Sequence, residues 1–204
     1  MASNTTGISS TALGKDCAFL NTTGRDNTLI GDAAGYYNTS GSGNVMVGSR
    51  NNVGAYVPIF GLSTANNRVG IGHSGTTNAY VQVAWTVVSD QRDKADITNF
   101  THGLDYVNKL RPVNYVWDNR INYEDGVPDG SKKKSEVQLG FLAQEVQAVE
   151  TGLGIDNNAI IDKEQPDQLR MTESKLIPVL VNAVQELSAQ LTTLQAEVKT
   201  LKGE

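Results

Sequence analysis

The pattern of apolar and polar positions divides the chain near residue 88. Upstream of that point, apolar residues occur in short groups separated by glycine, asparagine and threonine. The pairs Leu13-Gly14, Ile30-Gly31 and Val47-Gly48 recur at a period of 17 residues. Each unit joins a short β-compatible piece, such as residues 27–30 or 44–47, to a Gly-rich turn. A unit this small cannot bury an apolar face alone, so it must stack on its neighbours or on other chains.

The period therefore predicts that residues 1–88 form a Gly/Asn-rich repetitive β shaft of the β-roll or β-prism kind. A flexible linker is the alternative, and the regular spacing argues against it. Further strands are predicted between residues 49 and 88, at 55–60, 68–72 and 79–85. Because each strand has few apolar residues, we do not expect this segment to be stable as a monomer, and three chains wound together would supply the missing core.

Downstream, residues 89–204 have the pattern of an α+β domain. Apolar residues at helical spacing predict helices, and alternation of apolar and polar residues predicts half-buried strands. Between these elements the sequence predicts two polar loops, of which the second contains an apolar patch at 159–161. The predicted elements are helices at 103–110 and 143–149, strands at 113–117 and 136–142, and loops at 123–134 and 152–167.

The C-terminal residues have the most regular pattern in the chain. Apolar residues alternate by three and four over more than three heptads, which is the seam of a coiled coil. Pro178 is tolerated only near a helix start, so the helix is predicted to begin at 172–174 and the coiled coil to span about 174–202. A helix buried within one chain is the alternative. The seam residues are Ile177, Leu180, Val184, Leu187, Leu191, Leu194, Val198 and Leu201.

Composition excludes several classes of function. The net charge is −5, with four basic and three acidic residues in 1–88 against 13 basic and 19 acidic in the remainder, so neither part has the basic stripe of a nucleic-acid binder. A single cysteine, Cys17, excludes an intrachain disulfide and suits a reducing cytosol. No apolar run is long enough to span a membrane, and no secretory signal follows Met1. His73 and His102 are isolated, so no metal site is expected.

The junction between the two parts carries candidate chemistry. A lysine amine that has lost its proton can act as the base for a serine hydroxyl, and Lys94 follows Ser89 by five residues. Five residues apart, the two side chains share neither a helix face nor a strand face, so they meet only if the chain turns between them. Asp90 and Asp93 suit a turn, and Arg92 is a candidate cation that would help to deprotonate the amine. A solvated polar turn is the alternative.

The residues around this pair are similar to a known family. Ser89 to Ile97 resembles the start of the self-cleaving intramolecular chaperone domain at the C-terminus of phage tailspikes and tail fibres, the S74 peptidase family. The repeats in turn resemble those of trimeric fibre and adhesin shafts, and Val69-Gly70-Ile71-Gly72 resembles a box that often precedes the chaperone domain. The resemblance of the domain continues through 103–105, 110–113, 115–118, 140–146, 177–180 and 183–187.

This resemblance implies a role for each part of the junction. Ser89 is the expected nucleophile, Lys94 the general base and Val88-Ser89 the scissile bond. Gln144 and Glu145 lie in the best-matched later segment and are candidates to orient a catalytic group, with helix capping or trimer contacts as the alternative. The heptads alone favour a dimer, whereas the family implies a homotrimer that folds upstream fibre modules of the same protein and then releases itself. No cofactor is expected.

The family also implies a location and leaves two other functions open. The protein is expected in the virion, as part of a tail fibre or tailspike assembled in the host cytoplasm. One alternative is a non-cleaving trimeric fibre tip with a structural or receptor-binding role. The other is an adhesin head in which the repeats bind host glycan through aromatic residues such as Tyr36, Tyr37 and Tyr56.

Overall fold

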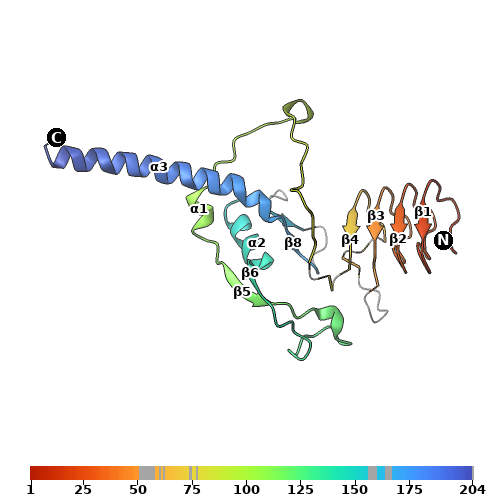
Figure 1. Cartoon of the computed structure of the whole chain (residues 1–204). Coiled ribbons are helices and arrows are strands. Elements are labelled where there is room, and N and C mark those ends of the chain that lie inside the picture. The colour runs from red at the N-terminus through yellow and green to blue at the C-terminus, as the bar shows by residue number, and fades with distance from the viewer. Residues whose placement is uncertain are drawn as a thin grey trace. The chain divides into compact units, whose positions relative to one another are not determined.

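The protein has a mixed α/β structure with a long C-terminal helix (Figure 1). The chain separates into two compact units, Met1–Val87 and Val88–Glu204, and each is described by itself. The computed structural model describes residues 1–50, 58–59, 61, 63–73, 75–76, 78–155, 160–163 and 167–203.

The first unit contains four short strands in one parallel sheet, in the order β1-β2-β3-β4 (Figure 1). The first three strands pair at the period seen in the sequence, so that Leu13 lies opposite Ile30 and Ile30 opposite Val47. The step to the fourth strand is longer and places Val47 opposite Ile71. We call these strands and their turns the repeat stack, and each turn of chain in it a rung. The strands are β1 (Thr11–Leu13), β2 (Thr28–Ile30), β3 (Val45–Val47) and β4 (Val69–Ile71).

The interior of the repeat stack is narrow and partly polar. The central strand residues Leu29 and Met46 are buried against small side chains of the turns, among them Ala18 and Ala34. Gly31 has a φ of +124°, and a Cβ built on it would lie 3.1 Å from the Gly48 backbone. A glycine is needed there because the conformation and the close approach of the next rung both disfavour a side chain.

Buried asparagines link successive rungs. The Nδ2 of Asn21 donates to the Oδ1 of Asn4 at 3.2 Å, and the Nδ2 of Asn38 donates to the Oδ1 of Asn21 at 3.1 Å. A second series uses Asn27, whose Oδ1 accepts the backbone N–H of Asn44 at 3.0 Å. Each of these contacts joins equivalent positions of successive repeats, so the repeat length that sets the strand register also brings the buried amides into contact. Asn38 Oδ1 is buried and has no hydrogen-bond partner among the described residues.

Two of the strands predicted in this region, at 79–85 and 55–60, are not found among the described strands. Residues 79–85 form no strand, and the side chains of Tyr80, Val83 and Trp85 are exposed. The strand prediction was wrong here because alternation describes two faces of a strand but supplies no hydrogen-bonding neighbour, and no described strand pairs with this segment. Most of the strand predicted at 55–60 lies outside the described residues.

The second unit combines two antiparallel strand pairs with helices. In the first pair Val113 lies opposite Gly140, and in the second Ile161 lies opposite Met171. In chain order the elements are η1 (Gln91–Asp93), α1 (Leu104–Val107), β5 (Val113–Val116), η2 (Arg120–Asn122), β6 (Val137–Gly140), α2 (Ala143–Gly152), β7 (Ile161–Asp162), β8 (Arg170–Met171), η3 (Glu173–Lys175) and α3 (Leu176–Leu201).

These elements meet in one apolar core. Helix α1 is shorter than the predicted 103–110 and its N-terminus docks on α3, where Leu104 N–H donates to Glu186 Oε2 at 3.0 Å. Of the apolar patch predicted at 159–161, Ile160 and Ile161 are buried in this core, and Ile161 begins a strand and is no part of a loop. Residue 159 lies outside the described residues. The core residues are Tyr106, Val146, Ile155, Ile160, Ile161, Leu176 and Val179.

A buried carboxyl and a buried phenol lie within this core. Glu150 Oε1 accepts the backbone N–H of Ile160 at 2.8 Å. Glu150 Oε2 and the Tyr106 hydroxyl are both buried and have no hydrogen-bond partner among the described residues. Burial, and secondly the nearby Glu150 carboxylate, raise the pKa of Tyr106 well above its ordinary value.

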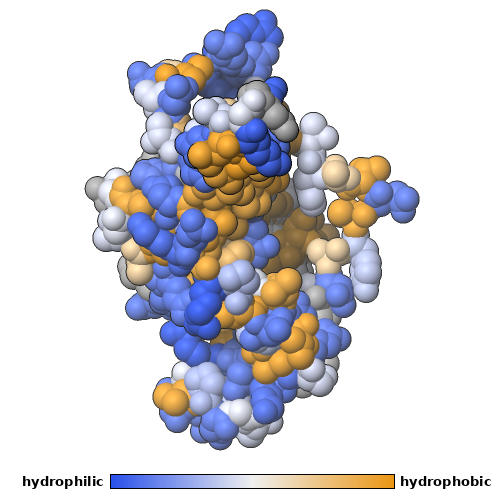
Figure 2. Space-filling model, turned by 90° about the vertical axis from the view of Figure 1, so that its left-hand side faces the viewer, coloured by the Kyte–Doolittle hydropathy of each residue, from blue (hydrophilic) through white to orange (hydrophobic). Residues whose placement is uncertain are grey.

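Helix α3 has two different apolar faces. Leu176, Val179 and Ala183 are buried against the rest of the unit. All eight residues of the predicted heptad seam, by contrast, are exposed. Figure 2 views the molecule from the C-terminal end of this helix and shows hydrophobic surface along it. The face that packs within the chain is therefore separate from the heptad face. None of the described helices combines the length and the apolar character needed to cross a membrane.

Candidate active site

A short turn shapes the junction after Val88. Ser89 and Asp90 lead into the 3-10 turn η1, and Asp90 caps it by accepting the backbone N–H of Arg92 at 2.9 Å. The backbone N–H of Lys94 donates to Gln91 O at 3.1 Å and closes the turn. This capped turn lets residues five apart approach each other.

The Ser89 and Lys94 side chains are in contact. Lys94 Nζ donates to Ser89 Oγ at 2.6 Å and also to the Ser89 carbonyl oxygen at 3.2 Å. This is the distance at which a base can take a hydroxyl proton. Chemically, the arrangement places an amine next to a hydroxyl that is one residue away from the Val88 carbonyl.

The cation of Arg92 is directed at Asp90. Arg92 Nη2 lies 2.7 Å from Asp90 Oδ2, and Nε donates to Oδ1 at 3.1 Å. The hydrogen bond from Arg92 lowers the pKa of Asp90, and the same bond raises the pKa of Arg92. The Arg92 guanidinium thus pairs with the carboxylate that caps η1. That Arg92 helps to deprotonate the Lys94 amine stays a prediction.

Solvent surrounds the pair in the single chain. Ser89 and Lys94 are exposed, and Val88 before them is 84% exposed. Among the described residues of the single chain, the turn holds the amine and the hydroxyl together, and no apolar side chains shield the pair from solvent.

Comparison with known families gives this turn a context. Residues 89–155 match the model of the S74 peptidase family described as the chaperone of endosialidase, and the match begins at Ser89. Residues 89–155 are therefore similar to the chaperone-of-endosialidase domain. The match supports a chaperone role associated with phage tails and suggests a self-cleaving peptidase. No curated protein matches the chain.

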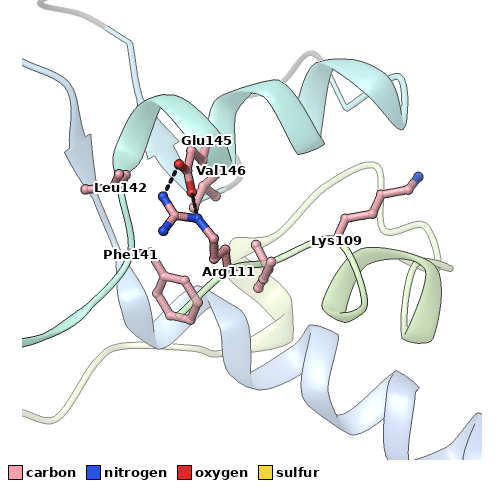
Figure 3. Close-up of a pocket in the computed structure, with 7 residues that line it drawn as sticks. Lys109, Arg111, Phe141, Leu142, Glu145 and Val146 are labelled. Carbon is pink, nitrogen blue, oxygen red and sulfur yellow. Dashed lines mark hydrogen bonds and ion pairs between the residues drawn. The ribbon is translucent and has the colours of Figure 1, made fainter. Parts of the chain in front are cut away.

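The two later candidates, Gln144 and Glu145, lie on α2, and Glu145 has a partner of its own. Arg111 Nε donates to Glu145 Oε2 at 3.1 Å, and Arg111 Nη2 pairs with Glu145 Oε1 (Figure 3). This pair raises the pKa of Arg111 and joins α2 to the segment before β5. Gln144 is exposed. The polar contacts of Glu145 thus go to Arg111, so any action of Gln144 or Glu145 on the Ser89–Lys94 pair stays a prediction.

A shallow groove surrounds the Arg111–Glu145 pair (Figure 3). Its empty volume is about 160 Å³, open solvent included, which is below the usual size of a ligand pocket. No pattern in the sequence indicates this pair, because its members are far apart in the chain and no motif connects them. The other lining residues are Lys109, Leu110, Phe141, Leu142 and Val146.

The remaining sequence candidates have local partners. His102 Nδ1 lies 2.6 Å from Asp105 Oδ2, and the described residues contain no group of three or more His, Cys, Asp or Glu side chains that could hold a metal ion. In the repeat stack the Tyr36 ring stacks on Phe19 with centroids 5.2 Å apart, and Tyr37 meets Tyr36 edge-on. Tyr56 lies outside the described residues.

Proposed function

We propose that residues 89–204 are an intramolecular chaperone that trimerises, aligns the repeats of residues 1–88 as a trimeric fibre shaft, and then detaches by cutting Val88-Ser89. The observation that carries the proposal is the 2.6 Å contact between Lys94 Nζ and Ser89 Oγ at the first residue of the family match. A serine and a lysine at this spacing are common by chance. Their contact at the start of this domain is much more specific.

The exposed heptad face of α3 supports trimerisation. Ile177, Leu187 and Leu194 are each more than half exposed, although apolar side chains gain about 25 cal/mol for each Å² removed from water. A parallel coiled coil of copies of this helix would bury the face. We place three helices in it because the family resemblance implies a homotrimer and because the interior that one chain builds in the repeat stack is narrow.

A chaperone is useful here because repeats are ambiguous. Rungs related by one repeat have nearly the same hydrogen-bonding groups, so two copies of the stack can meet out of register. Contacts between distant segments form only after chain entropy has been lost, which makes such assembly slow to start. A coiled coil that forms early raises the effective concentration of the three copies and aligns them.

The cutting step needs only groups that the chain contains. Neutral Lys94 takes the hydroxyl proton of Ser89, and Ser89 Oγ attacks the Val88 carbonyl carbon. The bond from Val88 C to Ser89 N breaks, the nitrogen receives a proton, and an ester joins Val88 to Ser89 Oγ. Water then hydrolyses the ester to a Val88 carboxylate and a free Ser89 hydroxyl. This is one turnover in cis.

Because Ser89 and Lys94 are exposed in the single chain, cutting would depend on assembly of the trimer. A solvated amine keeps its proton, and burial disfavours the charged form. If the trimer covers the turn, Lys94 becomes a base only after the three chains have joined. Released from its helper, the shaft would remain in the wound state because unwinding is slow.

The second candidate is a trimeric cap that remains attached without cleavage, and the exposed pair favours it. The mass of the purified full chain decides between the two, because cutting yields a fragment that begins at Ser89. Ser89→Ala and Lys94→Ala should each stay full length while still forming trimers, whereas the matched surface variant Lys109→Ala should be cut at the wild-type rate. Cutting of Ser89→Ala or Lys94→Ala at the wild-type rate refutes the assignment.

A further inference from the structure

The outward face of the sheet in the repeat stack is uncharged and largely apolar. In β2 and β3 the central residue, Leu29 or Met46, is buried in the stack, and the residues on either side of it point outward. Gly70 in the centre of β4 is also buried, whereas all three residues of β1 at the end of the sheet are exposed. We call the two outward columns the outer ladder. One column is Leu13, Ile30, Val47 and Ile71, and the other is Thr11, Thr28, Val45 and Val69.

The first column is an unbroken apolar line. Its members are direct neighbours in the sheet register and are exposed to 65%, 37%, 39% and 61% in chain order. The two central residues, Ile30 and Val47, are less exposed because each has a neighbour on both sides. Nothing in the described part of the first unit covers the end residues, Leu13 and Ile71.

We propose that the outer ladder is the surface through which three copies of this chain meet, each ladder packing against those of the other two around a three-fold axis. This inference rests on the proposed trimeric function and names the surface that the first unit uses. The second column contributes Val45 and Val69 to the same face.

The geometry of the ladder favours a copy of itself as the occupant. Neighbouring strands are about 4.8 Å apart, so the ladder presents one apolar group at each such interval. A second copy in the same register presents its groups at the same interval and fills each gap. None of the eight residues is charged, so identical faces approach without repulsion.

The number of residues in the outer ladder indicates whether it could hold the three copies together without another element. A stable interface uses about 20–30 residues on each side, and the outer ladder has eight. The ladder is therefore too small to hold free copies together, and needs copies that another element already keeps close. In the proposed function α3 does this, because tethered copies meet at an effective concentration of about millimolar.

Cysteine cross-linking in the full chain tests the surface. Val47→Cys should be joined to its own copy in the trimer by a short bis-maleimide, because equivalent residues near a three-fold axis lie close together. The control Thr23→Cys places a thiol on an exposed turn of the stack and should not be joined. Both variants retain Cys17, which is buried and whose pKa is raised by burial, so it reacts little in either.

A charge placed in the ladder gives an independent measurement. Ile30→Lys should keep the trimer, held by α3, and make residues 1–87 at least about tenfold more sensitive to proteolysis, because burying a lysine opposes closure. Thr23→Lys should stay within about twofold of wild type. Two outcomes would overturn the ladder proposal while leaving the proposed function standing, provided that the trimer forms. One is that Val47→Cys fails to cross-link. The other is that Ile30→Lys is no more sensitive to proteolysis than Thr23→Lys. If size measurement finds only monomers, the trimeric function fails and the ladder proposal fails with it.

Discussion

The buried hydroxyl of Tyr106 leads to the prediction that a substitution in the core raises the stability of the protein. Its ring is fully buried in the core of the second unit, and its hydroxyl has no hydrogen-bond partner in the described residues. A buried polar group without a partner costs about 1–3 kcal/mol. Tyr106→Phe keeps the ring and removes that cost, so it should stabilise the unit by about 1–2 kcal/mol. For a unit of this size the melting temperature should rise by about 4–8 °C.

The same residue predicts a dependence on alkaline pH. Burial, aided by the Glu150 carboxylate, raises the pKa of Tyr106 in the folded protein, while a tyrosine in the unfolded chain ionises near pH 10. The neutral form is thus favoured by folding. Its contribution to stability is complete below about pH 10 and falls as the pH rises above that value. Tyr106→Phe has no such group, so its advantage over wild type should grow above pH 10.

Urea unfolding of the full chain, at one protein concentration for all variants, measures both effects. The control is Tyr123→Phe, which removes a hydroxyl that donates to Asp118 Oδ1 at 2.6 Å and accepts the N–H of Lys132 at 2.9 Å. At neutral pH this second variant should lose stability. If Tyr106→Phe also lost stability, the Tyr106 hydroxyl would have a partner in the folded protein and the reasoning would be refuted.

Three further substitutions test other parts of the structure. Asp90→Ala removes the cap of η1 and should slow cutting of the full chain at least about tenfold without changing trimer size, whereas Asp90→Asn, which can still cap, should cut near the wild-type rate on a denaturing gel. Gly103→Ala puts a Cβ 2.7 Å from the Ala183 backbone nitrogen and should lower the unfolding free energy by about 1–3 kcal/mol, whereas Gly152→Ala, with open space around it, should not. Asn21→Ala breaks the asparagine series inside the stack and should cost about 1–3 kcal/mol in thermal unfolding, and more than Asn4→Ala at the exposed end.

Repetition and periodicity made parts of the fold predictable from the sequence. The period of the repeats indicated the spacing at which Leu13, Ile30 and Val47 line up, because identical units that pair in parallel meet at equivalent residues. The longer step from Val47 to Ile71 was not foreseen, because the 17-residue period ends at Val47-Gly48 and gives no spacing for the next strand. Residues 79–85 show the reverse case, in which the strand pattern is present but no partner is found among the described strands.

Contacts between distant residues were much less predictable. The heptads predicted the long helix, but not that Leu176 and Val179 form a second face that packs within the chain, because both faces consist of the same kinds of residue. At the junction, the turn-forming residues indicated how Ser89 could reach Lys94. The pairing of Arg111 with Glu145 depends on how α2 is placed in space, and local sequence carries no signal for it.

The repeat stack has a consequence for how such a protein can evolve. Each rung is hydrogen-bonded to the rungs before and after it, through the strands and through the asparagine series. A tandem duplication or deletion of one repeat in the gene would therefore lengthen or shorten the stack by one rung, about 4.8 Å, and leave both ends chemically as they were. Length could thus change in discrete steps, without selection having to rebuild the segment that follows residue 88.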